Sequence, residues 1–210
     1  MPQLTIRDVE ADDIPKLKAL IDDTWAWDDL ADDETVLDAL LGLYLNQVLY
    51  DSSFGKVAVL DGELAGAIFG CVEGDVPSYR MLQEDGTEHS LTLLNAAEHE
   101  RRDIYTCMST LNATYARLLD GKTYDGTLVF LAVAENAQGL GVGKALWHAL
   151  ASYFRERQAE RISVFSDTDC NFGFYEHSGF SKRETQALTC TFSKEVWQVD
   201  VYLYEYQFPS

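Results

Sequence analysis

The chain has 210 residues, of which 47% are hydrophobic, and a formal net charge of −19 at pH 7. This length and apolar content suit one domain with a sizeable core and exclude wholesale disorder. Such an acidic excess excludes nucleic acid as the partner, because phosphate binding needs a basic surface. No apolar run approaches the roughly 18 residues of a membrane helix, so we expect no membrane partner.

The cysteines and the N-terminus indicate a cytoplasmic protein. Four cysteines are scattered along the chain, without a C-x-x-C pair or a histidine at ligand spacing. This spacing predicts buried, reduced thiols and no metal site. Residues 1–10 contain no apolar stretch of the kind found in secretory signals.

The first third of the chain predicts a strand, two helices and a hairpin. Residues 4–9 alternate as in a strand, and residues 14–21 carry apolar side chains at helical spacing. The segment 36–48 has a second apolar helical face. The apolar runs 56–60 and 63–72 are joined by an Asp-Gly dipeptide, which is a strong hairpin signal.

The rest of the chain predicts a helical insert followed by alternating strands and helices. The segment 74–123 is polar at first and helical from about 91 to 119. A fully apolar run at 127–134 is typical of a central strand, and a glycine-rich turn then opens a helix. We expect the remaining elements to be a strand (161–165), a short helix (167–178) and two long strands (183–192 and 196–208).

The glycine-rich turn reads Gln138-Gly139-Leu140-Gly141-Val142-Gly143-Lys144. Glycines at the start of a helix leave backbone N–H groups open to an anion. The turn is not a Walker loop, since Gln138 and Ala145 stand where glycine and serine or threonine are needed. It is not a G-x-G-x-x-G loop either, because Lys144 takes the place of the last glycine. Alone, the turn also fits simple packing of a strand on a helix.

A second motif lies downstream and reads Phe174-Tyr175-Glu176-His177-Ser178-Gly179-Phe180. The ordered pair resembles the acyl-CoA loop, Arg/Gln-x-x-Gly-x-Gly/Ala, and the F-Y-x-x-x-G-F segment of the GNAT superfamily of N-acetyltransferases. The resemblance covers nearly the whole chain except the insert. It implies one GNAT-like domain over residues 1–210, with an α/β (α+β) fold. Its mixed, mostly antiparallel central sheet would be flanked by helices, with the helical insert between the third and fourth strands.

The resemblance implies acetyl-CoA as co-substrate, with no metal, and a set of residues that bind it. In the family, the loop amides cradle the pyrophosphate, and a bulge on the fourth strand pairs with the pantetheine arm. Thr168 stands where the family often has asparagine, so Asn171 is the substitute for that contact. The implied cofactor-binding residues are Leu131, Ala132 and Val133 at the bulge, Gln138, Gly139, Leu140, Gly141, Val142, Gly143 and Lys144 in the loop, and Asn171.

Tyr175 matches the family's general acid, which protonates the departing thiolate. A phenol with a reference pKa of about 10 keeps its proton at neutral pH and can donate it. The general base stays unassigned, because Thr127 stands where histone-type members have glutamate. Glu73, Asp125, Glu135 and a water relay all remain alternatives.

Charge and aromatic residues indicate where the acceptor binds. Residues 1–120 carry a net charge of −16, whereas residues 121–183 are neutral. Trp25, Trp27, Asp28 and Asp29 cluster between the first two predicted helices. An aromatic wall with carboxylates suits a cationic amine, although the same tryptophans would also serve to staple two helices.

These patterns predict an acyltransferase that moves an acetyl group from acetyl-CoA to the primary amine of a small, cationic acceptor. The transfer is expected to be direct, in a ternary complex. Two alternatives stay open, a non-catalytic acyl-CoA-binding regulatory module and a protein N-acetyltransferase. Tyr175 beside an intact loop favours an enzyme. The oligomeric state stays open, with a homodimer among the alternatives.

Overall fold

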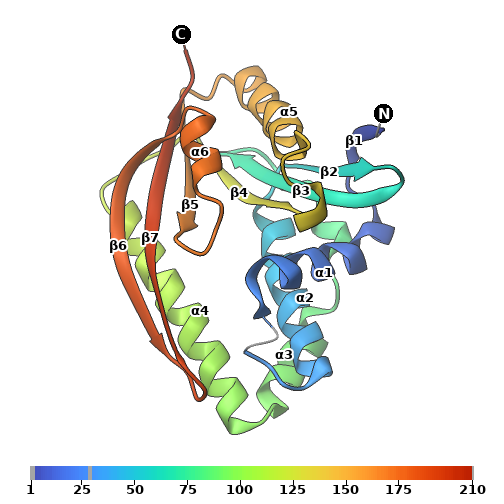
Figure 1. The fold of residues 1–210 in the computed structure, drawn as a ribbon, viewed down its shortest axis with the longest axis vertical. Helices are drawn as coiled ribbons and strands as arrows, with labels where there is room; N and C mark the ends of the chain where they lie inside the picture. The colour runs from blue at the N-terminus through green and yellow to red at the C-terminus, as the bar shows by residue number, and fades with distance from the viewer. Residues whose placement is uncertain (1–2, 28–29, 210) are drawn as a thin grey trace.

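The computed structural model describes residues 3–27 and 30–209, and its centre is a seven-stranded sheet in the order β1-β2-β3-β4-β5-β7-β6 (Figure 1). Every neighbouring pair is antiparallel except β4 and β5, which confirms the expected mixed, mostly antiparallel sheet. The strands are β1 (Leu4–Asp8), β2 (Phe54–Leu60), β3 (Glu63–Val72), β4 (Gly126–Val133), β5 (Arg161–Asp167), β6 (Ser181–Thr191) and β7 (Val196–Gln207).

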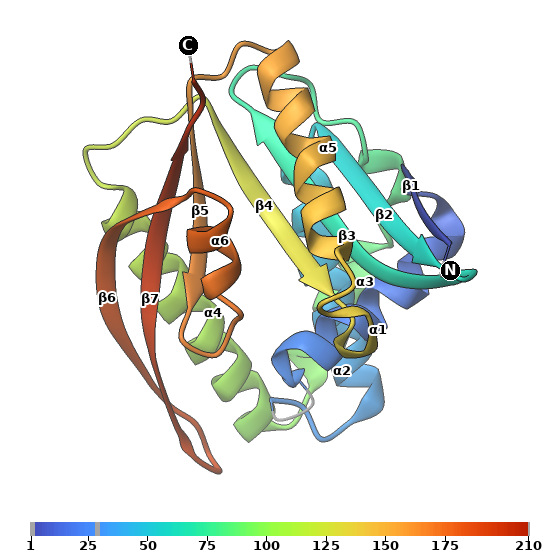
Figure 2. The same cartoon turned by 45° about the horizontal axis from the view of Figure 1, so that its top comes forward.

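Helices cover both faces of this sheet, with α5 and α6 on one side and α1, α2 and α4 on the other (Figure 2). Within the described ranges, no helix is long and apolar enough to cross a membrane. The helices are α1 (Ile14–Trp25), α2 (Glu34–Asp51), α3 (Gly86–Asn95), α4 (Glu98–Leu119), α5 (Val142–Glu156) and α6 (Gly173–His177).

The two faces have separate cores because successive residues of a strand point in opposite directions. Ile68 of β3 packs with Leu146 and Leu150 of α5, whereas its neighbour Phe69 packs with Leu45 on the side of α1 and α2. The apolar helical spacing read from the sequence therefore corresponds to helix faces that cover opposite sides of one sheet.

The segment between β3 and β4 forms α3 and α4, which confirms the expected helical insert. α3 lies against α2, while α4 runs along β6 and β7 on the face opposite α6 (Figures 1 and 2). Leu118 of α4 packs there with Leu188 and Val201. The insert is therefore part of the main fold and adds a wall beside the second half of the sheet.

One predicted helix is wrong at its start. The segment 167–178 was expected to be helical throughout, but the helix covers only Gly173–His177, and Asp167 ends strand β5. The Oδ1 atom of Asp167 accepts hydrogen bonds from the N–H groups of Asp169 and Cys170, at 2.9 and 3.1 Å. A short acidic side chain that bonds the backbone two or three residues on favours a turn over a helix.

The strands β4 and β5 pair over two positions only, Gly126 with Ile162 and Thr127 with Ser163. The Thr127 and Ser163 hydroxyls share a hydrogen bond of 3.2 Å at the same place. Beyond it the two strands diverge, as Figure 2 shows, and β5 pairs instead with β7 along its whole length.

A bulge in β4 accompanies this divergence, but not at the expected place. Phe69 and Gly70 of β3 pair with Phe130 and Leu128, so Val129 is left without a partner. The resemblance had placed the bulge at residues 131–133, yet these pair continuously with β3. A bulged residue bends its strand and increases the local twist, which fits a strand that turns away from its neighbour.

We predict that Gly126→Ala destabilises the fold, because a Cβ there would lie 2.5 Å from the backbone oxygen of Cys71. A backbone oxygen cannot rotate away, so the expected loss in free energy of unfolding is about 1–3 kcal/mol. The matched control is Gly86→Ala in the first turn of α3, where the nearest atoms lie 3.8 Å away. Urea denaturation of both variants is the measurement, and equal stabilities would contradict the tight fit at Gly126.

Candidate active site

The glycine-rich turn ends at the N-terminus of the 15-residue helix α5. Gly139 and Gly141 have φ values of +74° and +83°, and a Cβ on either would meet nothing within 4 Å. The first amide to find a helical acceptor is that of Ala145, which donates to the Gly141 oxygen at 3.0 Å. Among the described residues, the N–H groups of residues 142–144 have no backbone acceptor.

These amides form a site that suits an anionic group. Free N–H groups at a helix N-terminus, together with the positive end of the helix dipole, attract phosphate. Positive φ values turn successive amides outward without the steric cost that a side chain would add. The loop is also exposed, so a ligand can approach it from solvent.

The same loop lies beside α6 and the end of β4. A Cβ on Gly143 would be 3.3 Å from the ring of Phe174 and 3.6 Å from Val133. The two sequence motifs, 36 residues apart, therefore meet in space. The resemblance placed these groups at one site, and this contact is consistent with that placement.

Tyr175 lies in α6 with 8% of its surface exposed. Its ring stacks on Tyr204 at 5.6 Å and contacts Phe180 edge-on at 5.5 Å. Burial raises the pKa of Tyr175, and negative charge on Cys170 and Asp167 would raise it further. The phenol therefore stays protonated across the physiological range, as a proton donor must.

Aromatic rings gather on the opposite face of the sheet. Trp25 lies edge-on to Phe130 of β4 at 5.6 Å and to Tyr44 of α2 at 6.1 Å, while Trp27 meets Tyr44 at 4.7 Å. On the other side of the diverging strands, Tyr115 of α4 stacks on Phe165 of β5 at 4.2 Å.

Asp167 and Cys170 lie between these two aromatic groups. Asp167 pairs with Val201, whose side chain belongs to the core under α4, so Asp167 shares that face. The Trp25 Nε1–H group donates to the Cys170 sulfur at 3.4 Å, which joins α1 to the turn after β5. Burial raises the pKa of Asp167 and raises that of Cys170 to about 12.

The predicted site residues divide into three groups. Residues 138–144 form the open loop, and Leu131 and Val133 lie half-buried near it, with Ala132 buried on the other face. Asn171 is exposed in the turn before α6. Trp25 at the end of α1 and Trp27 in the connection after it are half-buried, whereas Asp28 and Asp29 are outside the described residues.

Sequence reasoning missed Tyr44, Tyr115, Asp167 and Cys170 as site residues. Tyr44 and Tyr115 fall within ordinary helical faces, and only the packing of the insert brings α4 beside β5. Asp167 was assigned to a helix start, although a polar residue at the end of a predicted strand is a usable signal. Of the proposed bases, Asp125 is tied at the other end of the sheet by the amides of Glu160 and Arg161.

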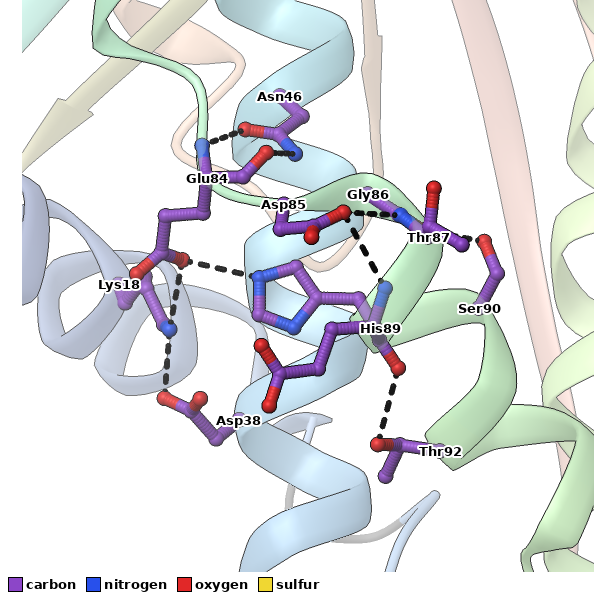
Figure 3. Close-up of polar contacts among 11 residues, drawn as sticks. Lys18, Asp38, Asn46, Glu84, Asp85, Gly86, Thr87, His89, Ser90 and Thr92 are labelled. Carbon is purple, nitrogen blue, oxygen red and sulfur yellow. Dashed lines mark hydrogen bonds and ion pairs between the residues drawn. The ribbon is translucent and has the colours of Figure 1, made fainter.

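A groove of about 770 Å³ lies elsewhere, between α2, α3 and the start of α4. Its carboxylates already have structural partners, since Asp33 and Asp85 cap helices and Glu100 accepts three backbone N–H groups. Figure 3 shows the neighbouring contacts, in which the nearly buried Lys18 binds Asp38 and Glu84. These contacts hold the insert on α1 and α2.

Comparison with known proteins identifies the family. The acetyltransferase (GNAT) family model matches residues 16–180. A search of curated proteins finds no match.

Solved structures give the same fold. Ribosomal-protein-alanine N-acetyltransferase from Brucella melitensis is 17% identical, with a TM-score of 0.56 over 97% of this chain and 99% of its own. The ribosomal-protein-S18-alanine enzyme from Escherichia coli is 12% identical, with a TM-score of 0.58 over 99% and 96%. PaiA N-acetyltransferase from Thermoplasma acidophilum, in complex with coenzyme A, is 13% identical, with a TM-score of 0.52 over 98% and 99%. At these identities the likeness concerns the fold.

Proposed function

The chain belongs to the acetyltransferase (GNAT) family, and on this premise we propose that it transfers an acetyl group from acetyl-CoA to the primary amine of a small acceptor. The observation that carries the proposal is the position of two groups around the diverging strands. The open amides at the start of α5 and the buried phenol of Tyr175 lie on one face, side by side. One face therefore offers both an anion site and a proton donor.

The residues of this face fit acetyl-CoA as a substrate. The pyrophosphate is assigned to the amides of residues 139–144, where the glycines leave room. Backbone groups of β4 beyond the two paired positions have no partner in β5, so they are available to the pantetheine arm and the acetyl carbonyl. Tyr175 then donates its proton to the departing thiolate.

Transfer is assigned as direct rather than through an acetylated cysteine. Cys170 is the cysteine nearest to Tyr175, but its raised pKa of about 12 keeps it a thiol. The thiolate is the nucleophilic form, so only about one molecule in 10⁵ would be reactive at pH 7. Two substrates bound together, one on each face of the sheet, need no such intermediate.

A small acceptor is favoured by what surrounds the face opposite Tyr175. The tip of the β6–β7 hairpin is fixed to α4, since the Ser193 N–H donates to Asp103 at 2.7 Å. Lys194 of the same tip forms an ion pair with Asp32, which precedes α2. The α1–α2 connection, α4 and the hairpin therefore border this face on several sides, which disfavours a folded protein as acceptor.

Thiol release from acetyl-CoA tests the function. We expect release that depends on an added small amine, and little release with peptides that carry a free N-terminal alanine or a lysine. Release with the peptides alone would favour the second candidate, a protein N-acetyltransferase. That candidate is suggested by the ribosomal-protein acceptors named for two structural neighbours.

We predict that Gly141→Val weakens coenzyme A binding by about tenfold or more, because a branched Cβ would fill the space that a phosphate needs. Gly74→Val is the matched control, since Gly74 has a φ of +85° against +83° and the same open surroundings. Calorimetric titration with coenzyme A compares the two. Equal affinities of the two variants for coenzyme A would show that this loop does not bind the pyrophosphate.

We predict that Tyr175→Phe lowers kcat by about 10²–10⁴-fold, the usual contribution of a general acid. Coenzyme A affinity should stay unchanged, because only the hydroxyl is lost and the ring keeps its packing. Tyr153→Phe in α5, a tyrosine of the same 8% exposure, should keep its kcat. An unchanged kcat in Tyr175→Phe, with chemistry rate-limiting, would leave Tyr175 a packing residue.

We predict that the protein incubated with acetyl-CoA alone keeps its intact mass, since burial raises the thiol pKa of all four cysteines, which lie within the described residues. Mass spectrometry after a short incubation is the measurement. A stable gain of one acetyl group that disappears in Cys170→Ala would show a covalent intermediate and contradict direct transfer.

A further inference from the structure

We propose that the acceptor is an amine with a single positive charge and an aromatic body, and that Asp167 receives the proton of its ammonium group. This inference rests on the proposed function and names its substrate class. It concerns the face opposite Tyr175, which we call the acceptor face. The acceptor face consists of Trp25, Trp27, Tyr44, Tyr115, Phe130, Phe165 and Asp167.

The first support is the composition of the acceptor face. Six of its seven side chains are aromatic, and they come from both sides of the diverging strands: Phe130 from β4 and Phe165 from β5. Aromatic rings attract one another edge-on or offset, and they also attract a cation over their faces. Such a surface favours a flat apolar body over a flexible polar chain.

The second support is the position of two tyrosines. Tyr44 and Tyr115 are only half-buried, yet burial is the first cause that raises the pKa of each. Each of these side chains therefore keeps some solvent contact while much of it is surrounded by protein atoms. A ligand in such a position would be largely removed from water.

The third support is Asp167, whose carboxylate lacks a cation. The buried carboxyl groups of Asp13 and Glu205 do have basic partners: Asp13 binds Arg7, and Glu205 binds Arg183 and Arg161. Among the described residues, no cation forms an ion pair with Asp167, and burial raises its pKa although its hydrogen bonds with Cys170 and Asp169 act in the opposite direction. Both of its backbone bonds reach Oδ1, so the second oxygen is left to the Cys170 thiol and to a ligand.

The fourth support is the state of the acidic groups near α2. Asp32 pairs with Lys194, Asp33 caps α2, and Asp38 pairs with Lys18. Three carboxylates that would otherwise attract a polycation are thus already satisfied. These three described carboxylates therefore give little reason to expect several charges on the acceptor, and a single ammonium group matches Asp167, the one carboxylate that belongs to the acceptor face as defined above.

Each proton of the proposed acetyl transfer has a donor and an acceptor. The ammonium group gives one proton to Asp167, and the neutral amine then attacks the acetyl carbon from the acceptor face. The carbon–sulfur bond breaks, and Tyr175 protonates the sulfur on the opposite face. The tyrosinate recovers its proton from the newly bonded nitrogen, and Asp167 releases its proton to water.

The acceptor class is tested with four amines, 2-phenylethylamine, tryptamine, n-butylamine and spermidine, at low and high salt. We expect kcat/KM to be about 3- to 10-fold higher for the two aromatic amines. Preference for spermidine or n-butylamine at both salts would overturn this inference and leave the proposed function intact. A protein that binds coenzyme A but acetylates none of the four would contradict both.

The aromatic surface is tested by Tyr115→Leu, which should raise KM for 2-phenylethylamine about 3- to 10-fold without changing coenzyme A affinity. Tyr105→Leu is the matched control, because it makes the same change on α4 at a side chain that is 73% exposed. Equal KM values for the two variants would remove Tyr115 from the acceptor site.

The role of Asp167 is tested by Asp167→Asn, whose amide oxygen can keep both backbone hydrogen bonds. We expect kcat/KM to fall about 10²–10⁴-fold at pH 7. In the wild-type protein, kcat/KM should rise with pH only up to the raised pKa of Asp167 and then level off. In the variant, kcat/KM should instead rise tenfold per pH unit towards the pKa of the free amine.

Few other groups would mask this profile. Those that face Asp167 are Asp169 and Cys170 of its own turn, Tyr115 of α4, Tyr175 of α6 and Tyr202 of β7. The pKa values of the thiol and the three phenols are raised, so they stay neutral where Asp167 titrates. The control is Asp200→Asn, on the exposed side of β7, which should keep the wild-type pH profile of kcat/KM. If Asp167→Asn and Asp200→Asn had the same pH profile, Asp167 would serve only to form its turn.

Discussion

Two parallel strands that share only two paired positions leave much of their facing backbone without partners in the sheet. Buried N–H and C=O groups need hydrogen bonds, so such an opening persists only if a ligand or water can satisfy them. The bulge at Val129 turns β4 away, and the full-length pairing of β5 with β7 holds β5 in place. The rest of the candidate site depends on this divergence, because groups on both faces of the sheet can then reach the opening between β4 and β5.

The two faces then differ in chemistry. The side of α5 and α6 carries free amides and a protonated phenol, which suit a phosphate and a departing thiolate. The side of α1, α2 and α4 carries aromatic rings and the carboxylate of Asp167, which has no ion-pair partner among the described residues. Asp167 and Tyr175 belong to opposite faces of the sheet, and a negative charge on Asp167 would raise the pKa of Tyr175.

Much of the fold could be predicted from local patterns. Sequence patterns gave the strands and the other helices in order, although the insert was expected to be one helical stretch and contains two helices, α3 and α4. The Asp61-Gly62 turn has the two positive φ values that such a dipeptide favours. The candidate site residues that the sequence offered are those of contiguous motifs, the loop and α6, and the structure brings these two motifs into contact. Tyr115 and Asp167 were missed because their importance comes from α4 packing beside β5, a contact between distant segments that no local pattern contains.

The central claim is that the opening between β4 and β5 binds acetyl-CoA, and a crystal structure with coenzyme A tests it most directly. The account predicts pyrophosphate oxygens within hydrogen-bond distance of the amides of residues 139–144, and the sulfur beside the Tyr175 hydroxyl. Coenzyme A bound instead in the groove between α2, α3 and α4, with the opening filled by side chains, would contradict it.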